Sequence, residues 1–252
     1  MAGDFDAAQA LIDQASHLAG EDPAGRAACA IEHGRLYNSA GQRDVARPLF
    51  HEAWRLAREA RAHALAVDAA HMIAIAGTLD DAIEWTATAL AYVGEHPEAE
   101  AWRGPLLNNL GWNYFDAGRF EDALPIFRQA TDVRHQQGRK LELRIAFHAV
   151  VTTLRALGRI EEARLLAEEV ADAAEAEGDQ APYMREELAE CHARLGDMDR
   201  ARLSARRALA ILEGRRLCHP GASPARQIAG TGRLSIGHRL CLGTTPPDPV
   251  GA

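Results

Sequence analysis

Long apolar runs, cysteines and lysines are all scarce in this sequence. No apolar run is long enough to cross a membrane, and the N-terminus lacks the segments of a secretory signal, so we expect a cytoplasmic protein with no membrane partner. The cysteines Cys29, Cys191, Cys218 and Cys241 lack metal-ligand spacing, which argues against structural zinc and a disulfide framework. Lys140 is the only lysine among 28 basic residues, a usage that a GC-rich genome would encode.

No group of residues predicts catalysis. The sequence contains no His-Glu-x-x-His pair, no nucleophile elbow and no phosphate-binding glycine loop. The eleven histidines are dispersed, with His63 and His71 eight residues apart, and we expect them to serve packing or the surface. The acidic pairs at 161–162, 168–169 and 186–187 flank arginine or leucine, as is typical of a solvated helix face. We therefore expect no enzyme, no cofactor and no metal site.

Composition predicts an all-α protein. Alanine is abundant, leucine, arginine and glutamate are frequent, and threonine and isoleucine are sparse. No stretch shows sustained alternation of apolar and polar residues, so we expect no strand before residue 214.

The clearest pattern lies in residues 108–130, which read NNLGWNYFDAGRFEDALPIFRQA. Gly111 and Ala123 are small where two helices would cross, and Tyr114 and Phe127 fill the wider gaps beside that crossing. Gly118 stands where the first helix must stop and the chain must turn. This segment resembles one tetratricopeptide repeat.

The same frame recurs around four other turn glycines, spaced about 36 to 41 residues apart: Gly41, Gly77, Gly158 and Gly196. The resemblance implies a right-handed α-solenoid of stacked antiparallel helix pairs with about five and a half repeats over residues 1–213. The half repeat spans 3–20, and the repeats lie near 27–60, 63–92, 104–136, 144–177 and 182–213. The opening half repeat either caps the stack or follows an upstream segment.

Helix signals place the first helix of each repeat near 24–40, 62–76, 100–117, 139–157 and 181–195. The second helices are expected near 4–19, 43–60, 79–92, 120–136, 160–177 and 198–213. Pro105 and Pro182 fall in first turns, where a missing N–H costs little. The spacing exceeds the family's usual length, most clearly at 93–98.

Residues 214–252 differ from the rest, because they are rich in glycine and proline and have no helical periodicity. We expect a disordered tail there. Five arginines against Asp248 give this segment a charge of +4, so the first 213 residues carry −12 of the net −8. A basic tail could touch nucleic acid, lipid or the acidic solenoid, but dispersed arginines without aromatics indicate a solvated segment, and no nucleic-acid partner is expected. An alternative is that a frameshift produced it.

The resemblance also implies a concave groove lined by the first helices, on which a peptide can lie. Asparagine amides can both donate to and accept from a peptide backbone, and Trp112 is either an aromatic anchor for a ligand or a core residue. Arg155 could bind a carboxylate. The acidic end of the groove, which includes Glu187, would prefer a basic segment. The usual groove positions correspond to Arg35, Asn38, His71, Asn108, Asn109, Trp112, Phe115, His148, Thr152, Arg155, Glu186 and Glu190.

Three functions are compatible with these observations. The favoured one is a non-catalytic interaction module or scaffold that binds a peptide or protein in the groove. A peptide-sensing regulator that changes curvature is the alternative, and an enzyme subunit is the third. If the stack ends at 213, Leu203, Leu209 and Ile211 have no following repeat to cover them, so we also expect self-association or fraying there.

Overall fold

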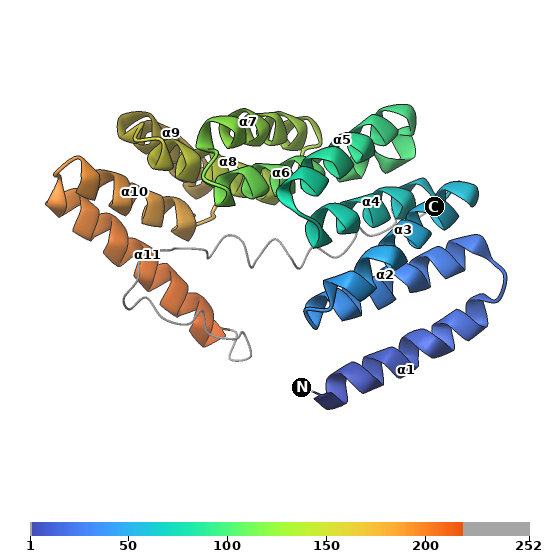
Figure 1. The fold of residues 1–252 in the computed structure, drawn as a ribbon. Helices are drawn as coiled ribbons and strands as arrows, with labels where there is room; N and C mark the ends of the chain where they lie inside the picture. Colours follow the sequence, from blue (N-terminus) through green and yellow to red (C-terminus); the bar gives the residue numbers. More distant parts are fainter. Residues whose placement is uncertain (1, 219–252) are drawn as a thin grey trace. The chain divides into compact units, whose positions relative to one another are not determined.

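The computed structural model describes residues 2–218, which form eleven α-helices and one 3-10 helix, with no strand among them (Figure 1). The all-α prediction is therefore confirmed. The elements are α1 (Ala2–Ala19), α2 (Pro23–Ser39), α3 (Arg43–Glu59), α4 (His63–Ala76), α5 (Leu79–Glu95), η1 (Pro97–Trp102), α6 (Arg103–Asp116), α7 (Phe120–Gln136), α8 (Lys140–Ala156), α9 (Ile160–Ala176), α10 (Pro182–Arg194) and α11 (Met198–Cys218).

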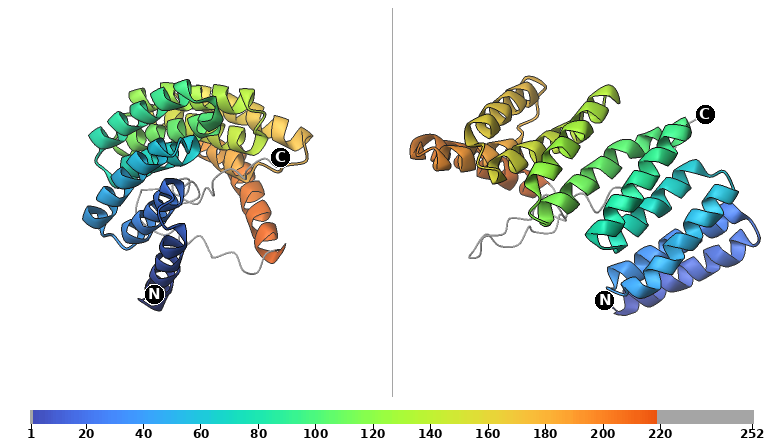
Figure 2. Two further views of the ribbon diagram at one scale, coloured as in Figure 1. Left: turned by 90° about the vertical axis from the view of Figure 1, so that its right-hand side faces the viewer. Right: turned by 45° about the horizontal axis from the view of Figure 1, so that its top comes forward.

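The chain divides into two compact units, Met1–Ala117 and Gly118–Ala252, the second described as far as residue 218. Within each unit, successive helices are antiparallel and pack on one another, as the views in Figure 2 show. The first helices of neighbouring repeats also touch, α2 against α4 in the first unit and α8 against α10 in the second. These contacts make the helix pair the repeating element of an α-solenoid.

The close approach of paired helices depends on small residues. Gly34 of α2 faces Phe50 of α3, and a Cβ added at Gly34 would lie 2.3 Å from Cε1 of that ring. Phe50 and its neighbours Ala46 and Ala53 are fully buried. The residue sizes expected at the helix crossing are therefore the sizes that the packing requires.

Most of the predicted turns have the expected conformation, but one does not. Gly118 has φ +74°, as a helix-ending turn requires. Gly77 instead has φ −90° and ψ −169°, which is extended backbone. Its small size is still needed, because a Cβ there would lie 2.4 Å from Cβ of Asp81. Asp81 and Thr78 form a capping box at the start of α5, so the five turns are not of one kind.

The longest repeat contains an insertion between α5 and α6. The helix α5 runs to Glu95, three residues beyond the expected end, and η1 fills residues 97–102 before α6 begins at Arg103. Ala99 and Trp102 of η1 are buried against α4 and α5. The extra residues therefore extend the core of the first unit.

The last described helix departs from the expectation in two ways. It continues to Cys218 rather than ending at 213. Ala205, at the frame position that the buried Phe127 holds after Gly118, is exposed, because α10 covers only the side of α11 that holds Ala201 and Ala208. Leu203 and Leu209 are 51% and 57% exposed, and self-association through them remains a prediction. The rest of the expected tail, 219–252, lies outside the described residues.

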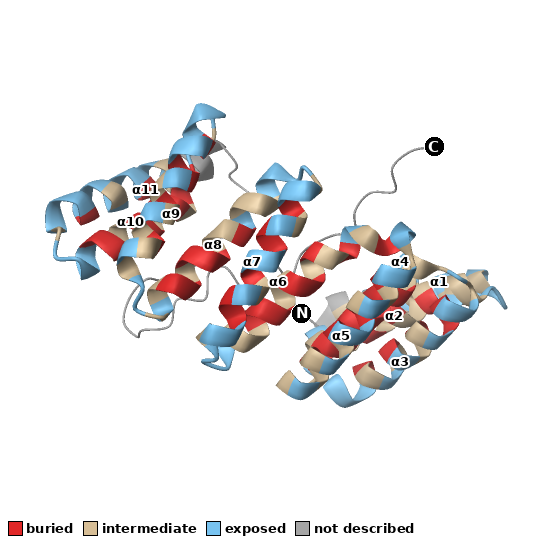
Figure 3. Cartoon of the chain, turned by 90° about the horizontal axis from the view of Figure 1, so that it is seen from above, coloured by how far each residue is buried: buried red, intermediate tan, exposed pale blue. Residues whose placement is uncertain are grey.

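Buried residues follow the faces between neighbouring helices, and the outer faces of the second helices are mainly exposed (Figure 3). Cys191 on α10 is fully buried, whereas Cys29 on α2 is half-buried, and both are free thiols. No helix in the described part of the chain is both long and apolar enough to span a membrane.

Candidate functional site

One position of the repeat frame carries the polar contacts between first helices. It lies nine residues before the turn glycine and is occupied by Asp68 on α4, Asn109 on α6 and Glu187 on α10. Each of these residues contacts the first helix of the preceding repeat. The contacted residue lies six positions before the turn glycine of that preceding helix, and it is Arg35, His71 or Thr152 respectively. Five of the predicted site residues contact the next repeat within their own unit: these three, with His148 and Arg155 of α8.

In the first unit, the contact between α2 and α4 is a buried ion pair. Nη2 of Arg35 donates to both carboxylate oxygens of Asp68, at 2.6 and 2.8 Å, and Nη1 donates to Glu32. Burial raises the pKa of Asp68 although Arg35 opposes this. Burial acts to lower the pKa of Arg35, but Asp68 and Glu32 outweigh it and raise that pKa. The guanidinium stays charged and is fixed by two carboxylates.

The contact between α4 and α6 involves a neutral histidine. His71 is 7% exposed, and burial, reinforced by the charge of Arg35, lowers its pKa to about 4. Nδ2 of Asn109 lies 3.0 Å from Nε2 of His71. An amide nitrogen can only donate, so Nε2 accepts and the proton of the neutral ring resides on Nδ1. The ring also lies 5.6 Å from that of Trp102.

In the second unit, a single carboxylate gathers three side chains of α8. Oε1 of Glu187 accepts from Thr152 at 2.8 Å, and Oε2 accepts from Nε of Arg155 at 2.8 Å. Nε2 of His148 lies 3.5 Å from Oε1. Burial lowers the pKa of His148, and Glu187 opposes that change. Glu187 is only 5% exposed, so the expectation of a solvated acidic face at 186–187 is wrong for this residue.

The neighbouring acidic residues of α10 are more accessible. Glu186 and Glu190 are half-buried, and Glu190 accepts from Nη1 of Arg194 at 2.6 Å. Burial, together with the negative charges of Glu187 and Glu190, raises the pKa of Glu186. This end of the second unit is therefore acidic where it meets solvent.

The remaining predicted site residues divide between surface and core. Asn38, Asn108 and Phe115 are half-buried, and Oδ1 of Asn38 is buried with no hydrogen-bond partner among the described residues. Trp112 is 8% exposed and meets Phe115 edge to face, with centroids 5.2 Å apart. Of the two roles considered for Trp112, burial favours the core residue, because an exposed anchor needs an accessible ring.

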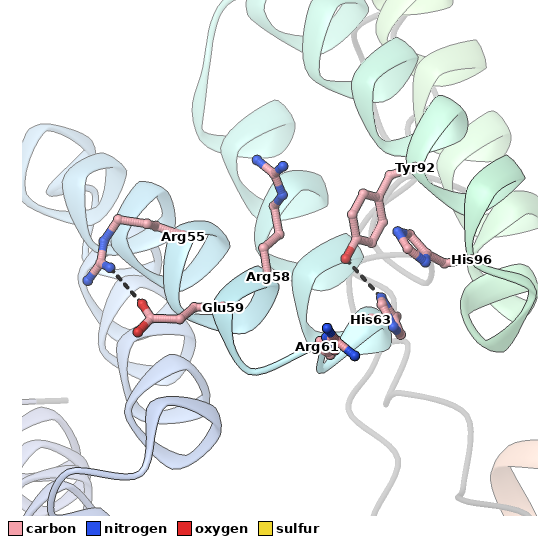
Figure 4. Close-up of a pocket in the computed structure, with 7 residues that line it drawn as sticks. All are labelled: Arg55, Arg58, Glu59, Arg61, His63, Tyr92 and His96. Carbon is pink, nitrogen blue, oxygen red and sulfur yellow. Dashed lines mark hydrogen bonds and ion pairs between the residues drawn. The ribbon is translucent and has the colours of Figure 1, made fainter.

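A separate hollow of about 570 Å³ lies where α3 ends, α4 begins and α5 ends (Figure 4). Its lining includes Arg58, Arg61, His63, Tyr92 and His96. The rings of the two histidines are stacked, with centroids 4.0 Å apart and 18° between their planes. The sequence did not predict this site, because its residues come from the ends of three helices, the turn at Arg61 and the insertion at His96, which no single motif brings together.

Comparison with known proteins identifies the repeat. The sequence profile of the tetratricopeptide repeat matches residues 106–176. A search of the curated proteins found no match.

Solved structures share the fold at low sequence identity. The crystal structure of BtubC (BKLC) from P. vanneervenii is 18% identical, with a TM-score of 0.71 over 91% of this chain and 96% of that one. A putative kinesin light chain from Podosopora anserina is 20% identical, with a TM-score of 0.62 over 77% and 98%. YrrB, described as a TPR protein with an unusual peptide-binding site, is 18% identical, with a TM-score of 0.50 over 82% and 94%.

The repeat profile, the helix pairs and these structural likenesses agree with one another. The fold is that of a protein-interaction scaffold. As the residues around Gly118 indicate, residues 106–176 carry the tetratricopeptide repeat, and the described helices share the fold of solved proteins built from such repeats.

Proposed function

We propose that this chain is a non-catalytic interaction module that binds a peptide or protein segment along its first-helix face. Each unit has a face of this kind by itself, formed by the partly exposed residues in the middle of α2, α4 and α6 in the first unit and of α8 and α10 in the second. Similarity to YrrB, whose description mentions a peptide-binding site, supports this class of ligand. The predicted site residues that remain accessible lie on this face.

The observation that carries the proposal is the fixed guanidinium of Arg35. Its side chain is held by Asp68 and Glu32 but remains 29% exposed. A polar group that is already ordered loses little conformational entropy when it binds a ligand. The half-buried amides Asn38 and Asn108 lie on the same unit. Asn108 can donate to and accept from a peptide backbone, whereas Asn38, whose Oδ1 is buried, can donate through its amide nitrogen.

The internal pairing narrows the ligand class. Arg35 and Arg155, the cations expected to meet a carboxylate, already hold Asp68 and Glu187. A ligand that needs free cations, such as a peptide's terminal carboxylate, is therefore disfavoured. The acidic surface at Glu186 and Glu190 suits a segment with basic side chains. We infer an extended, polar to basic segment as the ligand.

The test uses a library of displayed random peptides, selected on the whole chain, and titration calorimetry with the enriched peptide. The decisive variant is Arg35→Leu/Asp68→Leu, because replacing both members of a buried pair avoids leaving an unpaired charge. We expect this variant to bind at least tenfold more weakly, as a lost charged contact of about 1.4 kcal/mol would give.

The matched control is Arg128→Leu/Glu162→Leu, which removes an ion pair between the second helices α7 and α9. Binding unchanged in the control and lost in the decisive variant, at equal melting temperatures, would support the first-helix face. Enriched peptides that bind both variants equally would overturn it. A peptide that binds and also alters the radius of gyration in solution scattering would favour the peptide-sensing regulator.

A further inference from the structure

Three side chains of the first unit gather where α4 begins and where η1 follows α5. His63 is the first residue of α4, His96 caps the end of α5, and Glu98 belongs to η1. One ligand atom from each lies within 4.8 Å of the other two. We propose that His63, His96 and Glu98 form a binding site for a divalent transition-metal ion, with Zn²⁺ as the best match.

The donor set is the first argument. Two imidazoles and one carboxylate, with a water molecule as fourth ligand, form a set that Zn²⁺ takes in proteins. Tetrahedral ligands at zinc-binding distances are roughly 3.3 Å apart, so the three atoms must draw closer. The exposed side chain of Glu98 can rotate to do so. The two half-buried imidazoles, whose ring centroids are 4.0 Å apart, must turn out of their stacked arrangement, because a metal ion binds in the plane of each ring.

The second argument is the group behind one of the ligands. The hydroxyl of Tyr92 lies 2.9 Å from Nδ1 of His63, as the dashed line in Figure 4 marks. Metal-binding histidines commonly hold their other ring nitrogen in such a contact, which orients the ring. Nε2 of His63 is then the nitrogen available to a metal. Tyr92 is itself held edge to face by Trp54, with centroids 5.2 Å apart.

The third argument is where two of the ligands come from. His96 and Glu98 lie in the insertion that lengthens this repeat, and η1 packs through Ala99 and Trp102. Neither His96 nor Glu98 is needed for that packing. The insertion thus places two ligands beside His63, the first residue of α4, although His63 and His96 are 33 residues apart in the sequence.

Three arginines line the hollow, and Arg55 is paired with Glu52 and Glu59. The other two, Arg58 and Arg61, act against a cation. Arg58 lies over the ring of Trp54, with its guanidinium carbon 5.1 Å from the centroid. Arg61 has φ +55°, at a turn position that glycine occupies in the second unit. Arg61→Gly should therefore tighten a bound cation by removing a repelling charge. The same change should weaken a bound anion, so it separates the two kinds of occupant.

The experiment is titration calorimetry of Zn²⁺ into the whole chain without an affinity tag, after treatment with EDTA. All variants carry Cys218→Ser and Cys241→Ser, so that thiols of the C-terminal segment do not bind the metal. We expect one Zn²⁺ per chain, bound at least about 100-fold more weakly by His63→Gln/His96→Gln and about tenfold more weakly by Tyr92→Phe. Copper(II) spectra of the chain that carries only Cys218→Ser and Cys241→Ser should report two nitrogen ligands.

The control variant is His135→Gln, which removes an exposed histidine of α7 and should leave the affinity unchanged. Circular dichroism checks that every variant is folded. Equal Zn²⁺ affinities for the wild type and His63→Gln/His96→Gln would overturn the proposal. So would inorganic phosphate binding that is lost in Arg61→Gly without any Zn²⁺ binding, because the hollow would then be an anion site.

Discussion

In both units buried polar side chains join neighbouring first helices, but the two units use different side chains for these contacts. In the first unit, the buried carboxylate of Asp68 is held by Arg35, and the next contact along the face joins a neutral histidine to an amide. In the second unit, Glu187 alone gathers a threonine, an arginine and a histidine from α8. The frame position is the same in both units, nine residues before a turn glycine.

The difference teaches that the repeat frame fixes where first helices touch but not how they touch. Arg35 keeps a second carboxylate, Glu32, and 29% of its side chain meets solvent. Arg155 is 15% exposed, and its hydrogen bonds to a carboxylate all go to Glu187 among the described residues. We therefore expect the second unit to depend more heavily on its buried acid.

The largest effect is expected for Glu187→Met, which leaves Arg155 without its buried partner. Removing one member of a buried pair should lower the free energy of unfolding by about 3 kcal/mol. Urea denaturation followed by circular dichroism measures this. Arg155→Met/Glu187→Met should return to within about 1 kcal/mol of wild type.

The corresponding change in the first unit is Asp68→Leu. It should lower the free energy of unfolding, measured in the same way, by about half as much as Glu187→Met, because Arg35 keeps its ion pair with Glu32 and can reach water. Equal costs for the two acids would show that the units are not distinguished in this way.

Gly34→Ala tests whether each unit has its own core. The added Cβ would meet the buried ring of Phe50, and overpacking of this kind should cost about 2 to 3 kcal/mol. Hydrogen exchange should show faster opening of α2 and α3, with α8 to α10 unaffected. Gly94→Ala, which meets no atom within 4 Å, is the control and should stabilise slightly. Equal loss of protection in both units would mean that they unfold together.

Lowering the pH should destabilise the first unit more than the second. In the folded chain the pKa of His71 is about 4, against an ordinary value of 6.5, so folded His71 binds fewer protons between these values. Its contribution to stability is complete above pH 6.5 and is lost as the pH falls toward 4. At pH 5 the loss relative to pH 7 should be about 2 kcal/mol.

His148 provides the comparison, because Glu187 opposes the lowering of its pKa. Denaturation at pH 7 and pH 5 should show a weaker pH dependence for His71→Gln than for the wild type. His148→Gln should change this dependence less. The reverse order would contradict the assigned environments.

The smallest effect concerns the turn at residue 61. The second unit has Gly138 and Gly178 at positive φ after its second helices, where the first unit has Arg61. Arg61→Gly should relieve strained backbone and raise the free energy of unfolding by about 1 kcal/mol. Gly138→Ala should lower it by a similar amount. Thermal denaturation of the two variants gives the sign of each change.

The helices were predictable because their signals are local. The glycine and alanine spacing around Gly118 recurs through the chain, and it places the helix pairs within a few residues of their observed bounds. The register of Gly34 against Phe50 follows from residue size alone. Gly77 was predicted as a turn glycine, but its extended conformation was not, because its role depends on the side chain of Asp81 in the next helix.

The polar contacts were only partly predictable. Arg35, His71 and Thr152 were expected on the face, and so was Asn109, the partner of His71. Asp68, the partner of Arg35, was not singled out. Glu187, the partner of Thr152, was placed at the acidic end of the groove but was also taken for a solvated residue. A signal was present, since the partners share one position of the frame. Charge patterns along a single helix cannot show it, because the pairing crosses from one repeat to the next.

The buried thiol of Cys191 can report the opening of α10, because a labelling reagent reaches it only when this helix unpacks. Burial is the main cause that raises its pKa to about 11, so it stays protonated and unreactive while α10 is packed. Cys29 is more accessible and lies in the other unit. With Cys218 and Cys241 replaced by serine, the labelling rate of each remaining thiol measures how often its own unit opens. Mass spectrometry can follow both thiols in a single sample.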